Sequence, residues 1–258
     1  MAKPFVNPFV SGQLLELRVD ALVSDGRGLG RHDGVVVLVE DALPGQLVRA
    51  RVAAVRKSLA EAALVEVLER SPDEQEPPCP HAGRCGGCSW QSLAYGRQLA
   101  WKERIVHDAL ERVGKVACPP MLPILPSPSE WGYRNKMEFA FGVSGDGGKA
   151  LGLRERGSRN IVEVTGCLLQ TPLTMRVLEA VRMLSNGAFH DLDGRFLVVR
   201  EPNAGGCFVE LIVGAGGSLE AGERFAEALR AETPEVTGFA LSERLAPSDV
   251  AYGERALY

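Results

Sequence analysis

The chain has 258 residues, of which 45% are hydrophobic and 24% charged, and its net charge is -4. This composition is close to that of globular proteins and excludes a disordered chain. The negative net charge argues against a simple basic nucleic-acid binder but allows a local basic surface. The sequence contains no apolar run long enough to cross a bilayer and no apolar stretch of a secretory signal. We therefore expect a cytoplasmic protein with no membrane partner.

The segment 11–70 predicts a small antiparallel barrel, which follows an N-terminal tail at 1–10. Turn signals recur about every ten residues between short strand-like stretches, as in OB-fold barrels. In the segment 26–30 every second residue is glycine, and we interpret it as a hairpin turn because a strand follows it. The strand-like stretches are 15–23, 35–39, 48–54 and 63–68.

Residues 71–118 form a second predicted unit, a cysteine loop followed by a helix. Several prolines break the strand pattern and lead into the thiols. Residues 93–113 then repeat apolar side chains at helical spacing, and Gly114 provides a stop. This apolar stripe needs a cover, and without one it would form an exposed patch. The members of the stripe that we expect to be affected are Tyr95, Leu99, Val106 and Leu110.

Residues 119–258 predict a central α+β unit with a mainly antiparallel sheet, so the fold class of the chain is α+β or mixed. From Trp131 to Phe141 the side chains alternate with a period of two, which is typical of a strand. One helix is predicted after Thr171-Pro172 and another after Ser218, because these residues are typical of helix starts. Further strands are predicted at 150–153, 160–164, 196–199, 208–213 and 236–241.

Cys79, Cys85 and Cys88 lie close together in the sequence, and this spacing indicates a metal centre rather than disulfides. The two glycines before Cys88 let the backbone wrap tightly and leave amides to bond sulfur. A closed site needs a fourth ligand, and we choose Cys167, in a predicted turn, over Cys118. Spacing alone does not separate zinc from an iron–sulfur cluster, because both accept four thiolates.

The blocks around these thiols are Ser71-Pro72, Pro77-Pro78-Cys79-Pro80, Cys85-Gly86-Gly87-Cys88-Ser89-Trp90-Gln91, Tyr95, Gln98 and Lys102. They closely resemble the iron–sulfur segment of the bacterial RNA uridine carbon-5 methyltransferases. Tyr133-Arg134-Asn135-Lys136 followed by Phe139 resembles the central-domain signature of that family. The predicted barrel, with Gly26, Gly28, Gly30 and Pro44-Gly45, is similar to its RNA-binding TRAM domain.

The resemblance implies a 4Fe-4S cluster, with Cys167 at the position of the family's fourth ligand. It also implies S-adenosylmethionine as methyl donor and a uridine of ribosomal or transfer RNA as substrate. In such enzymes a cysteine thiolate adds to carbon 6, carbon 5 takes the methyl group, and a base removes the proton. The family carries these groups in a C-terminal methyltransferase domain, which we expect to be absent from this chain.

Because of that expected absence, the sequence assigns no catalytic and no cofactor-binding residue. S-adenosylmethionine would bind only if the missing domain were supplied, and a separately encoded methyltransferase domain would then be a partner. We expect the isolated chain not to methylate RNA. The glycine-rich segment 214–217 resembles a methyl-donor loop, but the strand before it is expected to form a hairpin. We therefore interpret it as a helix-entry turn.

Basic side chains between positions 131 and 160 form the predicted RNA contact, with six basic against three acidic residues. A row of cations can follow the phosphate backbone of RNA. The alternative interpretation is that these side chains only form a solvated face of the sheet. The candidate RNA-binding residues are Arg134, Lys136, Arg154, Arg156 and Arg159, with Arg49 and Arg51 on the barrel. The preferred hypothesis is the RNA-binding, cluster-bearing portion of an RNA (uracil-5-)-methyltransferase. The alternative is a stand-alone RNA-binding iron–sulfur or zinc module without catalytic activity.

Overall fold

The computed structural model describes residues 7–117, 119–247 and 249–258, and it divides into two compact units. The first unit comprises Met1–Pro78 and Cys88–Pro128, and the second comprises Cys79–Gly87 and Ser129–Tyr258. Each unit has its own hydrophobic core. None of the helices described is both long enough and apolar enough to cross a bilayer.

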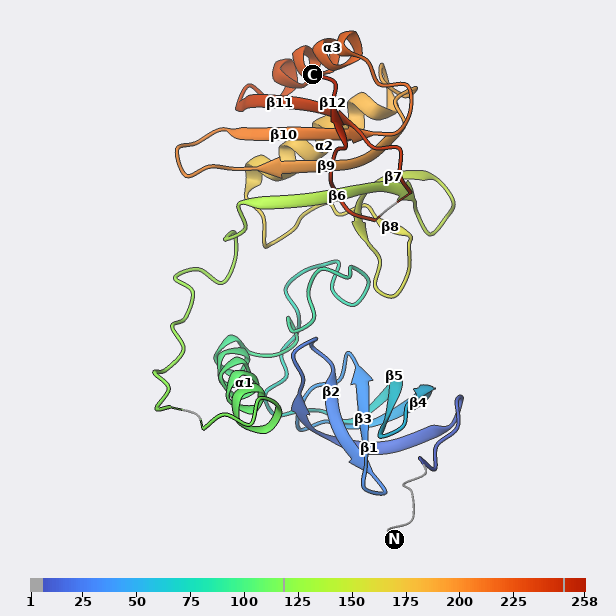
Figure 1. The fold of residues 1–258 in the computed structure, drawn as a ribbon, viewed down its shortest axis with the longest axis vertical. Helices are drawn as coiled ribbons and strands as arrows, with labels where there is room; N and C mark the ends of the chain where they lie inside the picture. The colour runs from blue at the N-terminus through green and yellow to red at the C-terminus, as the bar shows by residue number, and fades with distance from the viewer. Residues whose placement is uncertain (1–6, 118, 248) are drawn as a thin grey trace. The chain divides into compact units, whose positions relative to one another are not determined.

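Five strands of the first unit close into the predicted barrel, in the order β1-β2-β3-β5-β4 (Figure 1). The strands are β1 (Leu14–Leu22), β2 (Gly28–His32), β3 (Val35–Glu40), β4 (Leu47–Val55) and β5 (Leu59–Glu69). Neighbouring strands are antiparallel except β3 and β5, which run parallel and close the barrel. Alternate residues such as Val19, Val37 and Val48 fill the core and are almost completely buried.

The glycine segment of the barrel differs from the prediction, because β2 already begins at Gly28. A Cβ on Gly28 would lie 2.7 Å from the carbonyl oxygen of Ala42, and one on Gly30 would lie 2.3 Å from that of Arg18. Both glycines are therefore required by the close approach of a neighbouring strand or loop, whereas the sequence suggested a turn.

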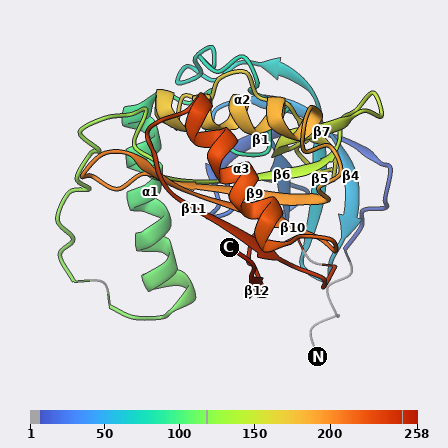
Figure 2. The same cartoon turned by 90° about the horizontal axis from the view of Figure 1, so that it is seen from above.

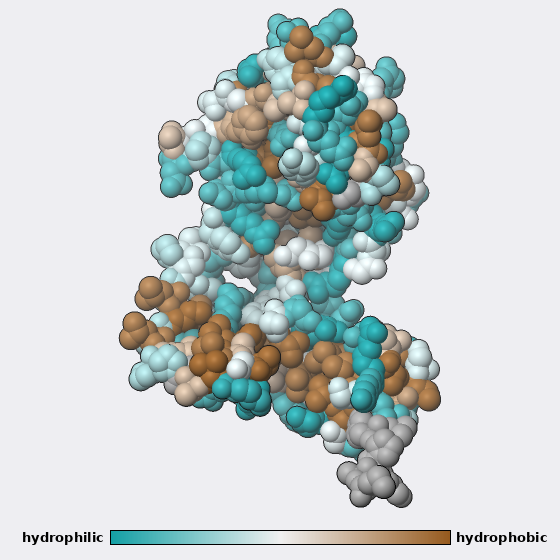
Figure 3. All heavy atoms as spheres, viewed as in Figure 1, coloured by the Kyte–Doolittle hydropathy of each residue, from teal (hydrophilic) through white to brown (hydrophobic). Residues whose placement is uncertain are grey.

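Helix α1 (Tyr95–Asp108) ends in a π-helical turn, Ala109–Val113, and it buries a different face from the one predicted. Trp101 packs into a small cluster around the fully buried Leu93. The second half of the helix and the segment after it carry exposed apolar side chains, which Figure 3 shows as a brown patch. These residues are Val106, Leu110, Val113, Val116, Met121, Leu122 and Leu125.

The second unit is a seven-stranded sheet in the order β12-β11-β10-β9-β6-β7-β8, with two helices on one face (Figure 2). Its elements are β6 (Lys136–Val143), β7 (Lys149–Arg154), β8 (Ile161–Val162), α2 (Pro172–Asn186), β9 (Gly194–Arg200), β10 (Cys207–Val213), α3 (Leu219–Glu232), β11 (Val236–Glu243) and β12 (Arg255–Ala256). Side chains such as Phe139, Leu197 and Phe225 are fully buried between sheet and helices. As predicted, the side chains of Thr171 and Ser218 cap the two helices.

One prediction about this sheet is wrong, and one segment has a topology that the sequence did not indicate. The strand expected from Trp131 begins only at Lys136, because residues 132 and 134 instead donate their N–H groups to the carbonyls of Leu168 and Leu169. The segment 214–217 follows the expected β9–β10 hairpin, but β10 also pairs in parallel with β11. That segment therefore begins a strand–helix–strand crossover within an otherwise antiparallel sheet.

The face of the sheet opposite the helices, which we call the open face, is covered only in part. Residues 244–247 and 249–254 lie across it, drawn in dark red in Figure 1. Ala251 packs against a small cluster that includes Ala140 and Phe196, and Asp249 forms an ion pair with Arg154 (3.0 Å). The ends of β6, β9 and β10 that carry Lys136, Arg200 and Phe208 lie beyond this cover.

Candidate functional site

The cysteine loop, residues Cys79–Gly87, is fastened to the sheet unit by backbone contacts. Cys85 forms an isolated β-bridge with Glu155, and Gly86 donates its N–H to the carbonyl of Arg154 (3.0 Å). These main-chain bonds place the loop beside the end of β7.

The same loop reaches the turn that carries Cys167. His81 accepts the N–H of Thr165 through Nε2 (3.1 Å), two residues before that cysteine. Cys85 and Cys167 are both half-buried and pack against the same hydrophobic core. Pro80 and Cys167 also line one pocket of about 480 Å³. The structure thus brings two of the four predicted ligands to one region.

Thiolates are the donors that a cluster or a zinc ion requires. Gln170 lines the same pocket as Cys167, and its buried carboxamide has no hydrogen-bond partner on either atom. The chemistry of this region therefore fits a bound polar group. However, the described residues contain no group of three or more His, Cys, Asp or Glu side chains arranged to hold a metal ion. Cys79 is half-buried in the loop, and Cys88 belongs to the other unit.

The two remaining cysteines are separate from this region. Cys118, the alternative fourth ligand, lies outside the described residues. Cys207 is fully buried in the core of the sheet unit, and burial raises the pKa of its thiol to about 11. A thiol held in its neutral form is a poor nucleophile, so Cys207 fits a packing role in this core.

Several of the predicted RNA-binding cations already have protein partners. Arg49 pairs with Glu16 and Glu66 at 2.6 Å each, and its hydrogen bonds with Glu16 raise its pKa. Lys136 pairs with Glu138. Arg154 bonds the carbonyl of Arg159 (2.6 Å) and the carboxylate of Asp249. A cation that is already paired with a carboxylate binds an RNA phosphate less strongly, because the phosphate must displace that carboxylate.

Three other predicted contacts have no carboxylate partner among the residues that the structure describes. They are Arg51, whose Nη1 bonds the carbonyl of Gly12, Arg134 and the exposed Arg159. Arg159 also lines a pocket of about 260 Å³ on the open face. Arg156 is half-buried, and its N–H bonds the carbonyl of Arg84 (2.9 Å). Of the predicted cations, Arg134 and Arg159 on the sheet unit and Arg51 on the barrel therefore have no carboxylate partner among the described residues.

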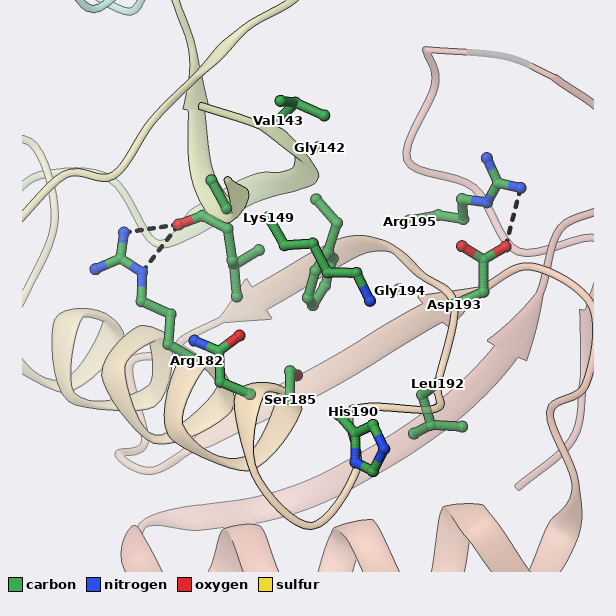
Figure 4. A pocket seen from close by; sticks show the side chains of 14 residues that line it. Gly142, Val143, Lys149, Arg182, Ser185, His190, Leu192, Asp193, Gly194 and Arg195 are labelled. Carbon is green, nitrogen blue, oxygen red and sulfur yellow. Dashed lines mark hydrogen bonds and ion pairs between the residues drawn. The ribbon is translucent and has the colours of Figure 1, made fainter. Parts of the chain in front are cut away.

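A further pocket of about 290 Å³ lies between the end of α2 and the β6–β7 hairpin (Figure 4). Lys149 points its ammonium group into it and has no partner among the described residues. Arg182 turns to the carbonyl of Leu151 (2.9 and 2.7 Å), and Asp193 pairs with Arg195 (3.0 Å). Most charged groups of this pocket are thus engaged with the protein itself.

Comparison with known proteins gives these sites a context. Residues 8–65 match the TRAM domain. The chain is 45% identical to an uncharacterized RNA methyltransferase of Nitratidesulfovibrio vulgaris, over 97% of this chain and 56% of that protein. It is 37% identical to the 23S rRNA (uracil(1939)-C(5))-methyltransferase RlmD of Acidithiobacillus ferrooxidans, over 71% of this chain and 41% of that protein. The chain is thus similar, over most of its length, to one region of proteins named RNA methyltransferases.

The fold is also that of a solved structure, the Pyrococcus abyssi tRNA (uracil-54, C5)-methyltransferase in complex with S-adenosyl-L-homocysteine. The TM-score is 0.63 at 22% identity, and the match covers 93% of this chain and 54% of that one. The predicted TRAM barrel and the predicted likeness to RNA methyltransferases are thus confirmed.

The chain spans about half the length of the curated relatives it matches. These relatives contain the matched region within a longer single chain. They give no support to the expectation that the catalytic domain is absent or is supplied by a separate protein, and we set that expectation aside.

Proposed function

We propose that this chain is the RNA-binding portion of an S-adenosylmethionine-dependent RNA (uracil-5-)-methyltransferase that acts on ribosomal or transfer RNA. The observation that carries the proposal is the 45% identity to a protein named RNA methyltransferase over 97% of the chain. The RlmD relative, which is named for methylation of a uracil in 23S rRNA, supports carbon 5 of uracil as the target. The donor is supported by the S-adenosyl-L-homocysteine in the Pyrococcus abyssi complex, and no residue of this chain is assigned to it.

RNA binding is supported by two features of the chain. The match to the TRAM domain covers the whole barrel core. On the sheet unit, Arg134 and Arg159 carry guanidinium groups without a carboxylate partner in the described residues. Such cations gain contacts when phosphates replace the counterions around them, so binding should weaken steeply as salt rises.

We also propose that Cys79, Cys85, Cys88 and Cys167 hold a 4Fe-4S cluster. The packing of Cys85 and Cys167 on one core supports the proposal, as does the unpartnered Gln170 beside Cys167. Membership of Cys88 rests on the sequence alone. A bound cluster would supply a cross-link between the loop and the sheet unit. Iron and sulfide that co-purify anaerobically would support it, whereas zinc alone would favour the alternative of a zinc-bearing RNA-binding module.

The RNA-binding function is tested by titrating a labelled fragment of 23S rRNA with the chain at several salt concentrations. We expect the logarithm of the binding constant to fall linearly with the logarithm of salt. Arg159→Ala should reduce this slope by about 0.7 to 0.9, the contribution of one phosphate contact. Arg230→Ala is the matched control, because Arg230 is exposed on α3, on the other side of the sheet. Absence of salt-dependent binding by the unmodified chain would refute the proposal.

A further inference from the structure

One row of side chains on the open face extends beyond the predicted contacts, which include only Lys136 of this row. Phe208 on β10 lies opposite Arg200 on β9, and Arg200 lies opposite Lys136 on β6. On its other side Phe208 pairs with Gly238 of β11. Residues that pair directly across neighbouring strands share a face of the sheet. The row Lys136–Arg200–Phe208–Gly238 therefore crosses four strands on one surface.

The glycine in this row determines how the aromatic ring lies. A Cβ added to Gly238 would be 2.7 Å from Cδ2 of Phe208 and 3.4 Å from its Cε2. The ring therefore lies down across the neighbouring strand, in the space where a side chain of β11 would otherwise stand. Phe208 is still 40% exposed, so one side of the ring rests on backbone and the rest meets solvent. This arrangement presents a flat aromatic surface.

The charge beside this ring is available. Arg200 is exposed and has no hydrogen-bond or ion-pair partner for its guanidinium in the described part of the chain. Lys136 adds a second positive charge to the row, although its ammonium group contacts Glu138. Glu210 is the next carboxylate along β10 on this face, and it accepts a hydrogen bond from Ser242 (2.7 Å). The row thus combines a flat ring with an unneutralised guanidinium.

The cover on the open face leaves this row accessible. Ala251 packs against the cluster that includes Ala140, Phe196 and Ile212. These residues lie four positions along their strands from Lys136, Arg200 and Phe208, respectively. Residues four apart in a strand are about 13 Å apart along it.

We propose that this row binds an unpaired nucleotide of the RNA, with the base stacked on Phe208 and its phosphate against Arg200 and Lys136. An aromatic ring on a sheet, flanked by cations, holds single-stranded RNA in a way that is tolerant of sequence, because every base has a π-face. The positive charge of Arg200 matches the phosphate. The inference rests on the proposed function and adds to it the class of RNA that this face takes, an unpaired strand.

The test uses the 258-residue chain and a fluorescein-labelled oligouridylate of about ten nucleotides, a length within the usual site size for single strands. Phe208→Ala should weaken binding about fivefold or more, as expected for the loss of one stacked base. Phe208→Leu should weaken binding to a similar extent, because leucine keeps the apolar volume but has no ring on which a base can stack. Phe208→Tyr keeps the ring and should bind as the unmodified chain does. Arg200→Ala should weaken binding and lower its salt dependence by about one phosphate contact, and Arg230→Ala should change neither.

The outcomes separate this inference from the proposed function. If the unmodified chain and Phe208→Ala bind the oligonucleotide equally well, the stacking site is refuted while RNA binding stands. If Phe208→Leu binds as the unmodified chain does, the contact is apolar and the inference also fails. If the unmodified chain binds neither this probe nor the rRNA fragment, the proposed function itself fails. Circular dichroism of each variant checks that it is folded.

Discussion

The barrel and the sheet unit use their charged residues differently. On the barrel wall, Arg49 contacts Glu16 and Glu66, and Arg18 contacts Glu69, so these cations face carboxylates of other strands. On the sheet unit, helices cover one face, and the open face keeps Arg200 without such a partner. Exposed pairs of this kind contribute little stability, about 0 to 1 kcal/mol, but they do neutralise the surface. A count of basic residues therefore does not distinguish the two surfaces, whereas the pairing of those residues does.

The two units have separate hydrophobic cores, so a mutation in one core should leave the stability of the other unchanged. The largest loss of stability should come from Phe225→Ala in the sheet unit. Phe225 is fully buried, and its ring lies 4.8 Å from that of Phe189 and 5.7 Å from that of Phe239. Its truncation should cost about 3 to 5 kcal/mol. Hydrogen exchange should show faster exchange in β9–β11 and unchanged exchange in β1–β5. Equal loss of protection in the barrel would mean that the two cores unfold together.

A pH-dependent effect should also be confined to the sheet unit. Burial disfavours the thiolate and raises the pKa of Cys207 to about 11 in the folded protein, from 9.0 for an ordinary thiol. Between these values the unfolded chain loses a proton that the folded chain keeps, so stability should fall as pH rises from 9 to 11. The loss is at most about 2 to 3 kcal/mol.

The pH effect is measured by urea denaturation at pH 8 and pH 11, monitored on the sheet unit. Cys207→Ala should lose stability at both pH values but should show less change between them. If the variant keeps the full alkaline loss, another group is responsible, and Cys207 does not distinguish the two units.

The smallest of the three effects should fall on the barrel. Gly30→Ala places a Cβ 2.3 Å from the carbonyl oxygen of Arg18, so β1 and β2 must separate. We expect a loss of about 1 to 3 kcal/mol, seen as faster hydrogen exchange in the barrel alone. Gly96→Ala is the matched control, because a Cβ there meets no atom within 4 Å and helix propensity should improve. A neutral Gly30→Ala variant would show that the barrel tolerates a wider strand spacing.

Local patterns in the sequence were sufficient for much of the fold. The alternation in 15–23 and 48–54 predicts barrel strands, because each residue's burial follows from its own position in the pleat. Thr171-Pro172 and Ser218 predict helix starts because caps act within three residues. The start of β6 could not be predicted, since residues 132 and 134 bond a segment more than 30 positions away. The parallel pairing of β10 with β11 depends in the same way on distant partners.

The candidate site shows the same limit. Residue type marks Arg154 as a possible RNA contact, but its partner Asp249 is 95 positions away and is invisible to a local pattern. Arg200 and Phe208 become neighbours only through the register of β9 with β10, and they join Lys136 only through β6. The cysteine spacing is a local signal, and it predicts the loop but not whether the thiols assemble.

The two edges of the seven-stranded sheet have a consequence for self-association. Its outermost strands, β8 (Ile161–Val162) and β12 (Arg255–Ala256), are two residues long. A strand of another copy that approached either margin would find few backbone groups with which to continue the ladder. A strand added to β8 or β12 itself would therefore gain few ladder hydrogen bonds.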